Sequence, residues 1–516
     1  MPQLKISWFK FTLLNSILIT LLNFNLHLFV YEKLQNLWLT LVFVVAYFGL
    51  VHAILSVVFV KYLTKFFSIF FIVASCVSIY FITFYGVLID SDMIQNVVQT
   101  DTKEVLDLIN WRVVVLSFVV LVFCILISRI RIENPSLGGG IIKIMRTRIL
   151  SILLGLFVFL IAFLPLSKTF MPFFRNYSEI RMYNVPFYQI YAVYRYYVRF
   201  LKPKPEFKII AKDAFLENNS TKKLLVLVVG ETARAANYSL NGYAKNDTNF
   251  YTKKEGVVFF NDFSSCGTAT AVSLPCMFSF SKRQNYSSAE FGENAMDILQ
   301  KVGVNATWID NNSGGCKGVC ERLLDKKQLS SDYDENLLPH LKERLANLST
   351  QNIIVLHLQG SHGPTYYKRY PDAFKKFTPT CDTNELSKCD NEALINTYDN
   401  TLLYTDFILS EIIKLLKEMS DYQSSLIYLS DHGESLGENG IYLHGMPYTI
   451  APKTQTHIPA IFWSNDENLM DLAQKHKNLK LSQDNLFSTL LGYFDVNSSV
   501  YEVNYDLLNQ ALKANQ

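Results

Sequence analysis

The stretch Leu224-Leu-Val-Leu-Val-Val229, followed by Gly230-Glu-Thr-Ala-Arg234, decides the fold of the C-terminal part of this chain. An uncharged run of valine and leucine this short is typical of a strand that is buried on both faces of a parallel sheet. Similar apolar runs alternate with helical patterns farther along, at 306–309, 353–358, 425–429 and 458–463. Residues 220–516 are therefore predicted to form an α/β domain with a mainly parallel central sheet.

Polar side chains follow three of these predicted strands. The strand ends are followed by Glu231, by His362, and by Asp431 and His432, with His444 in a glycine-rich loop farther on. Because the carboxyl ends of parallel strands meet at one edge of a sheet, we expect these side chains to lie together. Each alone is typical of an ordinary structural residue, but their recurrence at one edge predicts a metal site. Carboxylate and imidazole ligands favour zinc, with manganese as the weaker candidate.

A second informative run is Cys266-Gly-Thr-Ala-Thr-Ala-Val-Ser-Leu-Pro-Cys276, which carries the hydroxyls of Thr268, Thr270 and Ser273. A turn of small residues lets the backbone approach a ligand closely. If the turn opens a helix, its free N–H groups favour a bound phosphate. A metal or a base could then lower the pKa of one threonine hydroxyl and make it a nucleophile. The residues by themselves do not choose between Thr268 and Thr270.

The first 170 residues have a different character. Half of the 516 residues are apolar and the mean hydropathy is +0.16, which is high for a wholly soluble protein. Long apolar runs predict membrane spans near 11–31, 37–60, 66–89, 111–129 and 149–167. The alternative, buried core helices, is disfavoured by five such runs within residues 1–170. The sequence therefore predicts a five-helix transmembrane domain.

Loop charges orient these spans. The connections after the second and fourth spans are basic, with Lys61 and Arg129 among their residues, whereas the loop after the third span is acidic. The positive-inside rule places the N-terminus and the basic loops in the cytoplasm. With five spans, everything after the last one lies outside the membrane on the far side. The length of the first span argues against a cleaved signal peptide.

Cysteine spacing tests this topology. Six of the eight cysteines form close pairs in the predicted exterior part, Cys266 with Cys276, Cys316 with Cys320, and Cys381 with Cys389. Close pairs in an oxidising compartment indicate local disulfides. A zinc-ribbon type of site is the alternative, but the unequal spacings do not match one.

The segment 171–219 links the two predicted domains. Residues 184–200 are crowded with aromatic side chains and carry Arg195 and Arg199, a composition that suits a helix lying in the membrane interface. An ordinary amphipathic core helix is the alternative. Lys202-Pro-Lys-Pro205 then predicts a break and a linker. The net charge of +3 is too small to indicate a nucleic-acid partner.

Six motifs together resemble one family. They are GETAR (230–234), CGTATAVSLPCMFS (266–279), NNSGGCKGVC (311–320), GSHGPTYYKRYP (360–371), CDTNEL (381–386) and SDHGESLGENGIYLHGMPY (430–448). This combination resembles the bacterial phosphoethanolamine transferases, inner-membrane enzymes of the alkaline-phosphatase superfamily that include the mobile colistin-resistance enzymes. The resemblance implies an alkaline-phosphatase- or sulfatase-like fold for the C-terminal domain.

The resemblance also implies roles for individual residues. Thr270 would be the nucleophile, and one zinc would be held by Glu231, Thr270, Asp431 and His432. His362 and His444 match positions that bind a second zinc or contact the transferred group, and Lys317 would face the phosphate. In the acidic loop, Asn96 and Glu104 match positions proposed to contact the donor headgroup.

The implied reaction moves phosphoethanolamine from phosphatidylethanolamine to Thr270, releasing diacylglycerol, and then to an acceptor. Family members modify lipid A, core oligosaccharide or proteins, and no motif in this chain selects among them. The implied location is the bacterial inner membrane, with the catalytic domain in the periplasm and with polymyxin resistance as a consequence of lipid A modification.

Three other functions compete with this interpretation. A sulfatase would need a C-x-P-x-R signature, which the chain lacks. A phosphoglycerol transferase also has five spans and a threonine nucleophile. The three cysteine pairs and the residues of the GETAR and CGTATAVSLPC motifs disfavour this function. A transporter or sensor would have charged or broken spans along a path, whereas polar residues in the spans are few and concentrate in the first span, as Asn15, Asn23, Asn25 and His27.

Overall fold

The computed structural model describes residues 4–100, 102–133, 140–201, 206–217, 220–288 and 290–514. The chain divides into two compact units. Unit 1 comprises residues 1–91 and 109–195, and unit 2 comprises residues 92–108 and 196–516. The sequence places segment 92–108 between two spans of the N-terminal domain, yet this segment packs within unit 2 together with the C-terminal domain.

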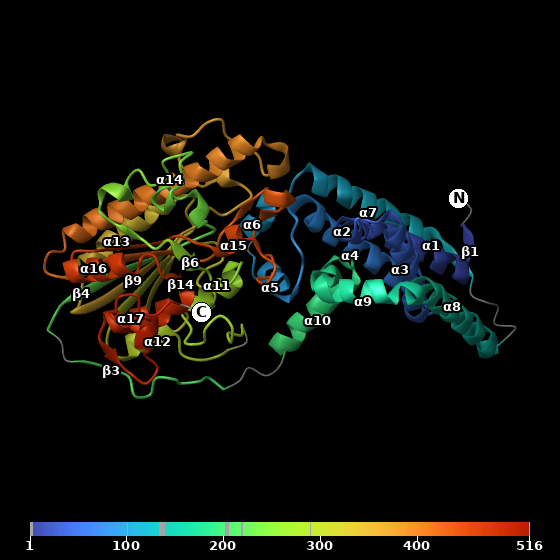
Figure 1. Cartoon of the computed structure of the whole chain (residues 1–516), viewed down its shortest axis with the longest axis horizontal. Helices are drawn as coiled ribbons and strands as arrows, with labels where there is room; N and C mark the ends of the chain where they lie inside the picture. Colours follow the sequence, from blue (N-terminus) through green and yellow to red (C-terminus); the bar gives the residue numbers. More distant parts are fainter. Residues whose placement is uncertain are drawn as a thin grey trace. The chain divides into compact units, whose positions relative to one another are not determined.

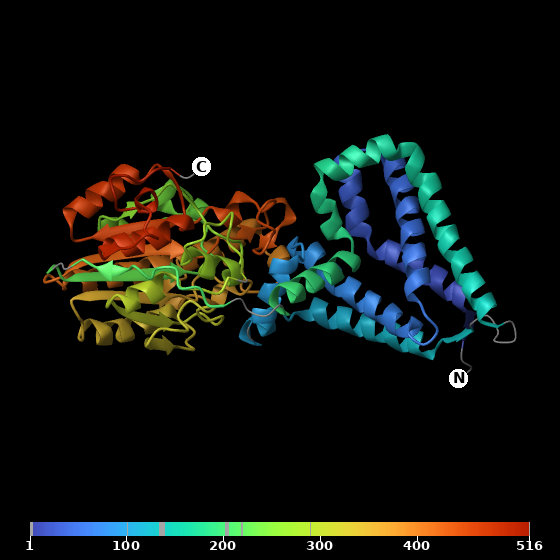
Figure 2. The same cartoon turned by 90° about the horizontal axis from the view of Figure 1, so that it is seen from below.

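Helices make up most of unit 1 (Figures 1 and 2). They are α1 (Trp8–Leu22), α2 (Phe24–Leu34), α3 (Leu37–Val58), α4 (Thr64–Tyr85), α7 (Trp111–Arg129), α8 (Gly140–Phe163) and α9 (Ser167–Asn176), with α10 (Phe187–Leu201) leading into unit 2. Among the described residues, four segments are long and apolar enough to cross a membrane, namely α3, α4, α7 and the stretch Ile142–Asn176. The bent pair formed by α1 and α2 makes the fifth if it is one span.

The first span is bent rather than straight. Helices α1 and α2 meet at Asn23 and enclose a bend of 52°. The Asn23 side chain accepts a hydrogen bond from the Val185 amide at 2.9 Å and donates one to the Val185 carbonyl at 2.7 Å. The same side chain also donates to the Ile19 carbonyl, one turn earlier in α1. Side-chain bonds of this kind to the helix backbone often accompany a bend, and the helix axis changes direction at Asn23.

Two glycines allow α3 and α8 to cross closely. A Cβ atom on Gly49 would lie 2.7 Å from the Gly155 carbonyl oxygen, and one on Gly155 would lie 2.7 Å from the Gly49 carbonyl oxygen. Small residues at such crossings are typical of helix packing in membranes, where dispersion contacts replace the hydrophobic effect. Phe118 on α7 and Phe157 on α8 are by contrast exposed, as lipid-facing side chains would be.

Unit 2 is built on a seven-stranded sheet in the order β5-β13-β10-β4-β9-β7-β8. The strands are β4 (Lys223–Gly230), β5 (Val258–Phe259), β7 (Asn305–Asp310), β8 (Asp325–Gln328), β9 (Gln351–His357), β10 (Gln423–Ser430) and β13 (Ala460–Ser464). Strand β4 lies in the centre and pairs in parallel with β10 and β9. The predicted parallel sheet is thus confirmed for the strands that carry the polar motifs.

One strand runs against the prediction. The run 458–463 was expected to join the sheet in parallel, but β13 pairs antiparallel with both β10 and β5. A short apolar run carries no sign of its direction, because burial on both faces looks alike in either orientation. The sheet is therefore mixed at this side and parallel in the middle.

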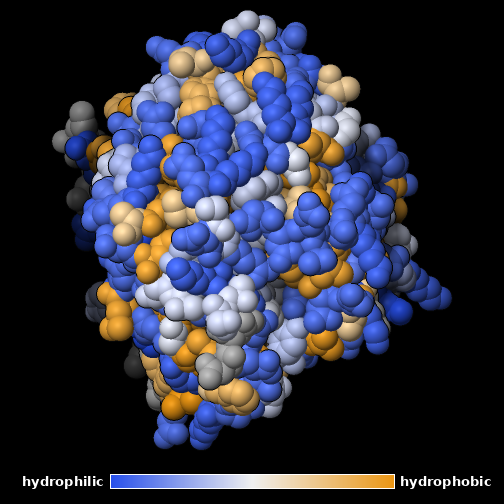
Figure 3. All heavy atoms as spheres, turned by 90° about the vertical axis from the view of Figure 1, so that its left-hand side faces the viewer, coloured by the Kyte–Doolittle hydropathy of each residue, from blue (hydrophilic) through white to orange (hydrophobic). Residues whose placement is uncertain are grey.

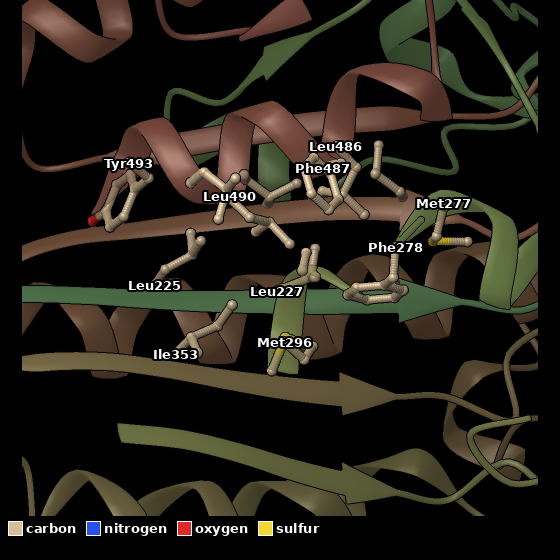
Figure 4. Close-up of a cluster of buried hydrophobic side chains, with 14 of the residues drawn as sticks. Leu225, Leu227, Met277, Phe278, Met296, Ile353, Leu486, Phe487, Leu490 and Tyr493 are labelled. Carbon is tan, nitrogen blue, oxygen red and sulfur yellow. The ribbon is translucent and has the colours of Figure 1, made fainter. Parts of the chain in front are cut away.

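Helices cover both faces of the sheet. Leu225 and Leu227 point into a core shared with α12 (Ala295–Lys301) and α17 (Leu486–Tyr493), as Figure 4 shows. The alternate residues Leu224 and Val226 point into a second core shared with α13 (Leu337–Leu345) and α14 (Asn391–Lys417). Alternation along one strand into two separate cores is what a three-layer α/β/α domain requires.

The outer surface of unit 2 fits an aqueous environment. The face turned to the viewer in Figure 3 is mostly hydrophilic, with apolar side chains scattered over it. The three cysteine pairs expected from spacing are joined as disulfides, and the two remaining cysteines, Cys76 and Cys124, lie in α4 and α7. The predicted linker Lys202–Pro205 lies outside the described residues.

Candidate functional site

The carboxyl ends of β4, β9 and β10 bring the predicted polar residues to one edge of the sheet. Gly230, the last residue of β4, pairs with Ser430, the last residue of β10, so Glu231 and Asp431 leave the sheet side by side. Gly360 lets the chain after β9 approach this point, because a Cβ atom there would lie 2.7 Å from the Glu231 carbonyl oxygen. Its φ of +53° also favours glycine.

The side chains of Glu231, Asp431 and His432 converge. His432 Nε2 lies 3.4 Å from Glu231 Oε1 and 3.3 Å from Asp431 Oδ2, and one donor atom from each residue falls within 4.8 Å of the others. At most 1% of any of these residues is exposed. Two carboxylates so close together and so deeply buried repel each other unless a positive charge lies between them.

The donor atoms fit a divalent cation. Asp431 Oδ1 accepts hydrogen bonds from the amides of Thr232 and His432. Asp431 Oδ2 is buried, and no described residue donates a hydrogen bond of normal geometry to it. The Nδ1 atom of His432 lies 3.0 Å from the Gly433 carbonyl, an arrangement that leaves the Nε2 lone pair for a metal. Two carboxylates and one imidazole match the ligand preferences of zinc.

Charge coupling in this cluster is strong. Burial, and then the negative charge of Glu231, raise the pKa of Asp431 to about 6. Burial opposes the ionisation of Glu231, but the neighbouring histidines, His432 first, hold the pKa of Glu231 below its usual value. A cation among these groups would keep both carboxylates ionised.

Thr270 is the hydroxyl that reaches the cluster. It is the first residue of α11 (Thr270–Met277), after Ala269 in extended conformation. Its Oγ1 donates to Glu231 Oε2 at 3.0 Å and lies 3.3 Å from His432 Nε2. The position at a helix N-terminus adds free N–H groups that favour a nearby phosphate.

The other two hydroxyls of the 266–276 run have structural partners. Thr268 Oγ1 donates to the Met446 carbonyl at 2.6 Å, and Ser273 Oγ donates to the Asp431 carbonyl at 2.5 Å. The sequence alone gives Thr268 and Thr270 equal standing as candidate nucleophiles. Their hydrogen bonds in the structure distinguish them. Of these three hydroxyls, Thr270 is the one that contacts the side chains of the candidate metal ligands, since Ser273 bonds the backbone of Asp431.

Two residues that sequence reasoning missed hold Glu231 in place. Asn312, just beyond β7, donates from Nδ2 to Glu231 Oε2 at 2.9 Å. Thr232 donates from Oγ1 to Glu231 Oε1 at 2.5 Å while its backbone has a φ of +59°. A β-branched residue in this region is strained, which indicates that the surrounding site imposes the conformation. The NNSGG and GETAR motifs contain both residues but give no sign of these contacts.

His362 and His444 lie beside the cluster. The His444 ring is 4.3 Å from the His432 ring and 5.9 Å from the His362 ring, measured between centroids. His444 Nδ1 is 3.5 Å from the carboxylate of Glu434, another residue to which the sequence assigned no role. Burial raises the pKa of Glu434 to about 8.

Lys317 is held in a constrained loop. The disulfide between Cys316 and Cys320 encloses it, and its φ of +47° is unusual for a residue with a side chain. Gly314 leaves room for the ammonium group, because a Cβ atom there would lie 2.7 Å from Lys317 Nζ. The Nζ atom donates to the Gln99 carbonyl at 3.1 Å.

Comparison with known proteins identifies the family. The model of phosphoethanolamine transferases EptA and EptB matches residues 47–200, and the sulfatase model matches residues 223–496. The chain is 39% identical over 512 residues to phosphoethanolamine transferase EptA of Escherichia coli strain K12, covering 94% of this chain and 92% of that protein. The chain belongs to the phosphoethanolamine transferase family. It is also 36% identical to phosphatidylethanolamine transferase Mcr-1 of Escherichia coli, over 90% of each chain.

Two solved structures resemble this transferase. The integral membrane protein lipooligosaccharide phosphoethanolamine transferase A (EptA) of Neisseria meningitidis matches with a TM-score of 0.91 at 32% identity, covering 99% of this chain and 100% of that one. The C-terminal periplasmic domain of phosphoethanolamine transferase EptC from Campylobacter jejuni is 80% identical, covering 60% of this chain and 100% of that one, with a TM-score of 0.59. These matches confirm an N-terminal membrane part joined to a sulfatase-like domain.

The segment 92–108 of the transferase brings further residues to unit 2. It contains all but the first residue of α5 (Ser91–Gln99) and the whole of α6 (Thr102–Asp107). Asn96 is half-buried, and its carbonyl accepts a hydrogen bond from Thr100 Oγ1 at 2.7 Å. The side chain of Glu104 lies outside the described residues.

An ion-pair cluster holds this segment against the transferase domain. The Asp107 carboxylate accepts from Thr365 Oγ1 at 2.7 Å, from Lys368 Nζ at 3.0 Å and from Arg369 Nη2 at 2.9 Å. Arg369 also donates from Nε to the His362 carbonyl at 2.9 Å. Burial opposes the charge on Asp107, but these partners hold the pKa of Asp107 below its usual value. One arginine thus bonds both the segment and the backbone of His362.

Proposed function

We propose that this protein transfers phosphoethanolamine from phosphatidylethanolamine to lipid A or another acceptor of the cell envelope, in two steps at Thr270. The position of the Thr270 hydroxyl carries the proposal, since it lies at a helix N-terminus and 3.0 Å from Glu231 Oε2. Membership of the transferase family supports the reaction class. The names of the relatives support the donor and the acceptor, because one is a phosphatidylethanolamine transferase and another a lipooligosaccharide transferase.

In the first step the Thr270 oxygen attacks the donor phosphorus. The bond from Thr270 Oγ1 to phosphorus forms, the bond to the diacylglycerol oxygen breaks, and diacylglycerol leaves with a proton. Glu231 accepts the hydrogen of this hydroxyl in the structure and so orients the oxygen. Asn96 and Glu104 contact the donor headgroup, and Lys317 faces the phosphate.

In the second step an acceptor oxygen attacks the same phosphorus. The Thr270 bond to phosphorus breaks and the threonine is regenerated, which gives ping-pong kinetics. His362 and His444, whose rings are 5.9 Å apart beside the cluster, are positioned to move protons or to stabilise developing charge.

A zinc ion fits this cluster. Glu231, Thr270, Asp431 and His432 would hold it, and manganese is the weaker candidate. A zinc ion there would supply Lewis acidity that lowers the pKa of the Thr270 hydroxyl. His362 and His444 are the side chains that would hold a second ion.

The proposed location is the inner membrane, with unit 2 in the periplasm. The three disulfides of unit 2 support an oxidising compartment. Membrane attachment confines the enzyme to the surface that holds both lipids. Adding an ethanolamine cation to lipid A weakens its attraction for cationic peptides such as polymyxins.

Intact-mass analysis of the purified full-length protein tests the proposal. After incubation with phosphatidylethanolamine, we expect one phosphoethanolamine adduct on the wild type and on Thr268→Ala, but none on Thr270→Ala. Thr268 is the matched control because it lies two residues away in the same run. An adduct that persists in Thr270→Ala would refute the nucleophile. A phosphoglycerol adduct formed from phosphatidylglycerol instead would favour the competing transferase.

A further inference from the structure

His444 follows a short hairpin whose backbone adopts an unusual conformation beside the histidine. Strands β11 (Ser435–Leu436) and β12 (Tyr442–Leu443) pair antiparallel, and His444 is the next residue after β12. Leu443 has a φ of +63° and Gly445 a φ of +87°. Glycine adopts this region freely, but a leucine there is strained and persists only where the surrounding structure holds it. The conformation of Leu443 therefore indicates a contact that holds the chain beside His444.

The side-chain amide of Gln455 supplies this contact. Gln455 lies in α15 (Lys453–Thr456) and is fully buried. Its Nε2 donates to the Leu443 carbonyl at 3.1 Å, and its Oε1 accepts from the Met446 amide at 3.1 Å. Nε2 also donates to Ser435 Oγ at 3.0 Å, on the other strand of the hairpin. One amide group thus bonds the chain on both sides of the histidine and the partner strand as well.

The main chain of Gln455 holds the neighbouring loop that carries His432. The Gly433 amide donates to the Gln455 carbonyl at 2.9 Å. This close approach favours glycine, because a Cβ atom on Gly433 would clash with the Thr454 carbonyl oxygen. The Gly433 carbonyl in turn lies 3.0 Å from His432 Nδ1. Gln455 therefore bonds the backbone beside both histidines, one through its main chain and the other through its side chain.

Loss of the Gln455 amide would shift this loop rather than unfold it. The Leu443 carbonyl and the Met446 amide would each lose a hydrogen bond, and a shift lets them reach other partners. The same shift relieves the strain at Leu443, so the strain and the lost bonds act in one direction. A backbone bond of 2.8 Å from the Gly445 amide to the Thr268 carbonyl does not depend on Gln455 and limits the movement.

We propose that Gln455 is a positioning residue that sets the spacing of the His432 and His444 rings, whose centroids are 4.3 Å apart. This inference rests on the proposed function, in which His444 moves protons or stabilises charge during transfer. Spacing matters for such a role because a displacement of about 1 Å can cost up to about a hundredfold in rate. Gln455 acts through the chain around His444 and needs no contact with the substrate.

Variants of the full-length protein in detergent test this role. Gln455→Met keeps the length of the side chain and removes its three hydrogen bonds. Gln455→Glu keeps an acceptor for the Met446 amide, and as a buried neutral acid it can donate one bond to the Leu443 carbonyl. Gln423→Met is the matched control, because Gln423 begins β10, whereas the site lies beyond the other end of that strand. Gln455→Asn, whose amide is too short to make the same bonds, replaces Gln455→Met if that variant does not fold.

Hydrogen exchange tests the contact without reference to catalysis. In Gln455→Met we expect the amides of residues 443–446 to exchange about tenfold faster, because Met446 loses the acceptor of its N–H group. The rest of unit 2 should keep its protection, and Gln423→Met should leave residues 443–446 as in the wild type. Unchanged exchange of these amides in Gln455→Met would overturn the proposal.

Steady-state transfer from phosphatidylethanolamine to diphosphorylated lipid A tests the consequence for the reaction. We expect kcat, measured per folded chain, to fall about tenfold in Gln455→Met, with the KM for both lipids unchanged. Gln455→Glu should be more active than Gln455→Met, although a buried carboxyl makes it the less stable of the two. A purely structural role would give the opposite order of activities and would therefore contradict the proposal.

The double variant Gln455→Met/His444→Ala shows whether the effect passes through the histidine. It should be no slower than His444→Ala alone, because an imidazole that is absent cannot be misplaced. Additive losses, or a wild-type kcat in Gln455→Met, would overturn the proposal. Absence of any adduct on Thr270 in the wild type would instead refute the proposed function, while faster exchange at residues 443–446 would still show that Gln455 holds this loop.

Discussion

At the scale of single residues, Asp431 Oδ2 is the atom that most clearly favours a bound cation. The atom is buried beside Glu231 and has no donor of normal geometry among the described residues. We predict that Asp431→Asn abolishes metal binding, because a neutral amide is a poor zinc ligand and leaves Glu231 to hold the ion with one imidazole. Elemental analysis of the purified protein should find about one zinc per chain in the wild type and much less in this variant.

A surface carboxylate provides the control for that measurement. Asp332 is exposed in unit 2, and Asp332→Asn should keep its zinc and its activity. Transferase activity of Asp431→Asn should fall about a thousandfold. Full zinc occupancy in Asp431→Asn would show that the cation, if one binds, lies elsewhere.

Sequence reasoning found the ends of strands more easily than the contacts between them. Glu231, Asp431 and His432 could be predicted because each follows an apolar strand at a fixed edge. Asn312, which bonds Glu231, was missed, since a loop asparagine carries no periodic signal. The choice of Thr270 over Thr268 needed family resemblance, and in the structure a hydrogen bond to Met446 distinguishes Thr268.

At the scale of elements, the small disulfide loop from Cys316 to Cys320 holds Lys317 at a positive φ. We predict that the double variant Cys316→Ser/Cys320→Ser loses about tenfold in activity, because Lys317 relaxes away from the phosphate. The stability loss should be modest, about 2 kcal/mol, since the disulfide closes a very short loop.

Comparison with Lys317→Met makes this prediction sharper. If the disulfide acts through the lysine, adding Lys317→Met to the double serine variant should cost little more activity. Initial rates and thermal melting, measured in parallel, separate loss of position from loss of fold. Additive losses from the two changes would show that the loop serves another purpose.

The elements that sequence reasoning placed least well were those with ambiguous patterns. The strand Ala460–Ser464 was expected to be parallel, but hydrophobic burial alone does not set direction. The first span was expected to be one helix, yet the side chain of Asn23 bonds Val185 and marks a 52° bend. A contact 162 residues away in sequence leaves no trace in local composition.

At the scale of the whole molecule, Asp107 fastens segment 92–108 to unit 2. We predict that Asp107→Asn lowers kcat/KM for the donor about tenfold, because three bonds to Thr365, Lys368 and Arg369 lose their charge partner. Hydrogen exchange of residues 92–100 should rise in this variant, as loosening of the segment requires.

A charge exchange provides the stringent comparison. Arg369→Asp alone should resemble Asp107→Asn or be worse, since Arg369 also bonds the His362 carbonyl. Combining it with Asp107→Arg should recover part of the exchange protection. Unchanged exchange in both single variants would mean that other contacts hold the segment.

Chelation is predicted to affect unit 2 as a whole. We expect chelation of the purified protein to abolish adduct formation on Thr270 and to lower the melting temperature of unit 2, because Glu231 and Asp431 then repel each other without a cation. Zinc should restore both properties, and manganese should restore them less completely. Full adduct formation in metal-free protein would contradict the proposed role of the cation.

The assembly of unit 2 from two separate stretches of chain has a consequence for the search for inhibitors. A soluble fragment that starts after the membrane helices contains Thr270 and the candidate ligands Glu231, Asp431 and His432 but lacks Gln95 and Asp107, which lie in residues 92–108. Gln95 lines a pocket of about 830 Å³ in unit 2, together with Ala271 and Phe280. Compounds selected on such a fragment would meet this pocket without the wall that Gln95 forms. Those that fill the space of Gln95 would compete with the enzyme's own segment, and those that bond the Gln95 amide would never be found. Screens on the full-length transferase would therefore yield a different set of ligands.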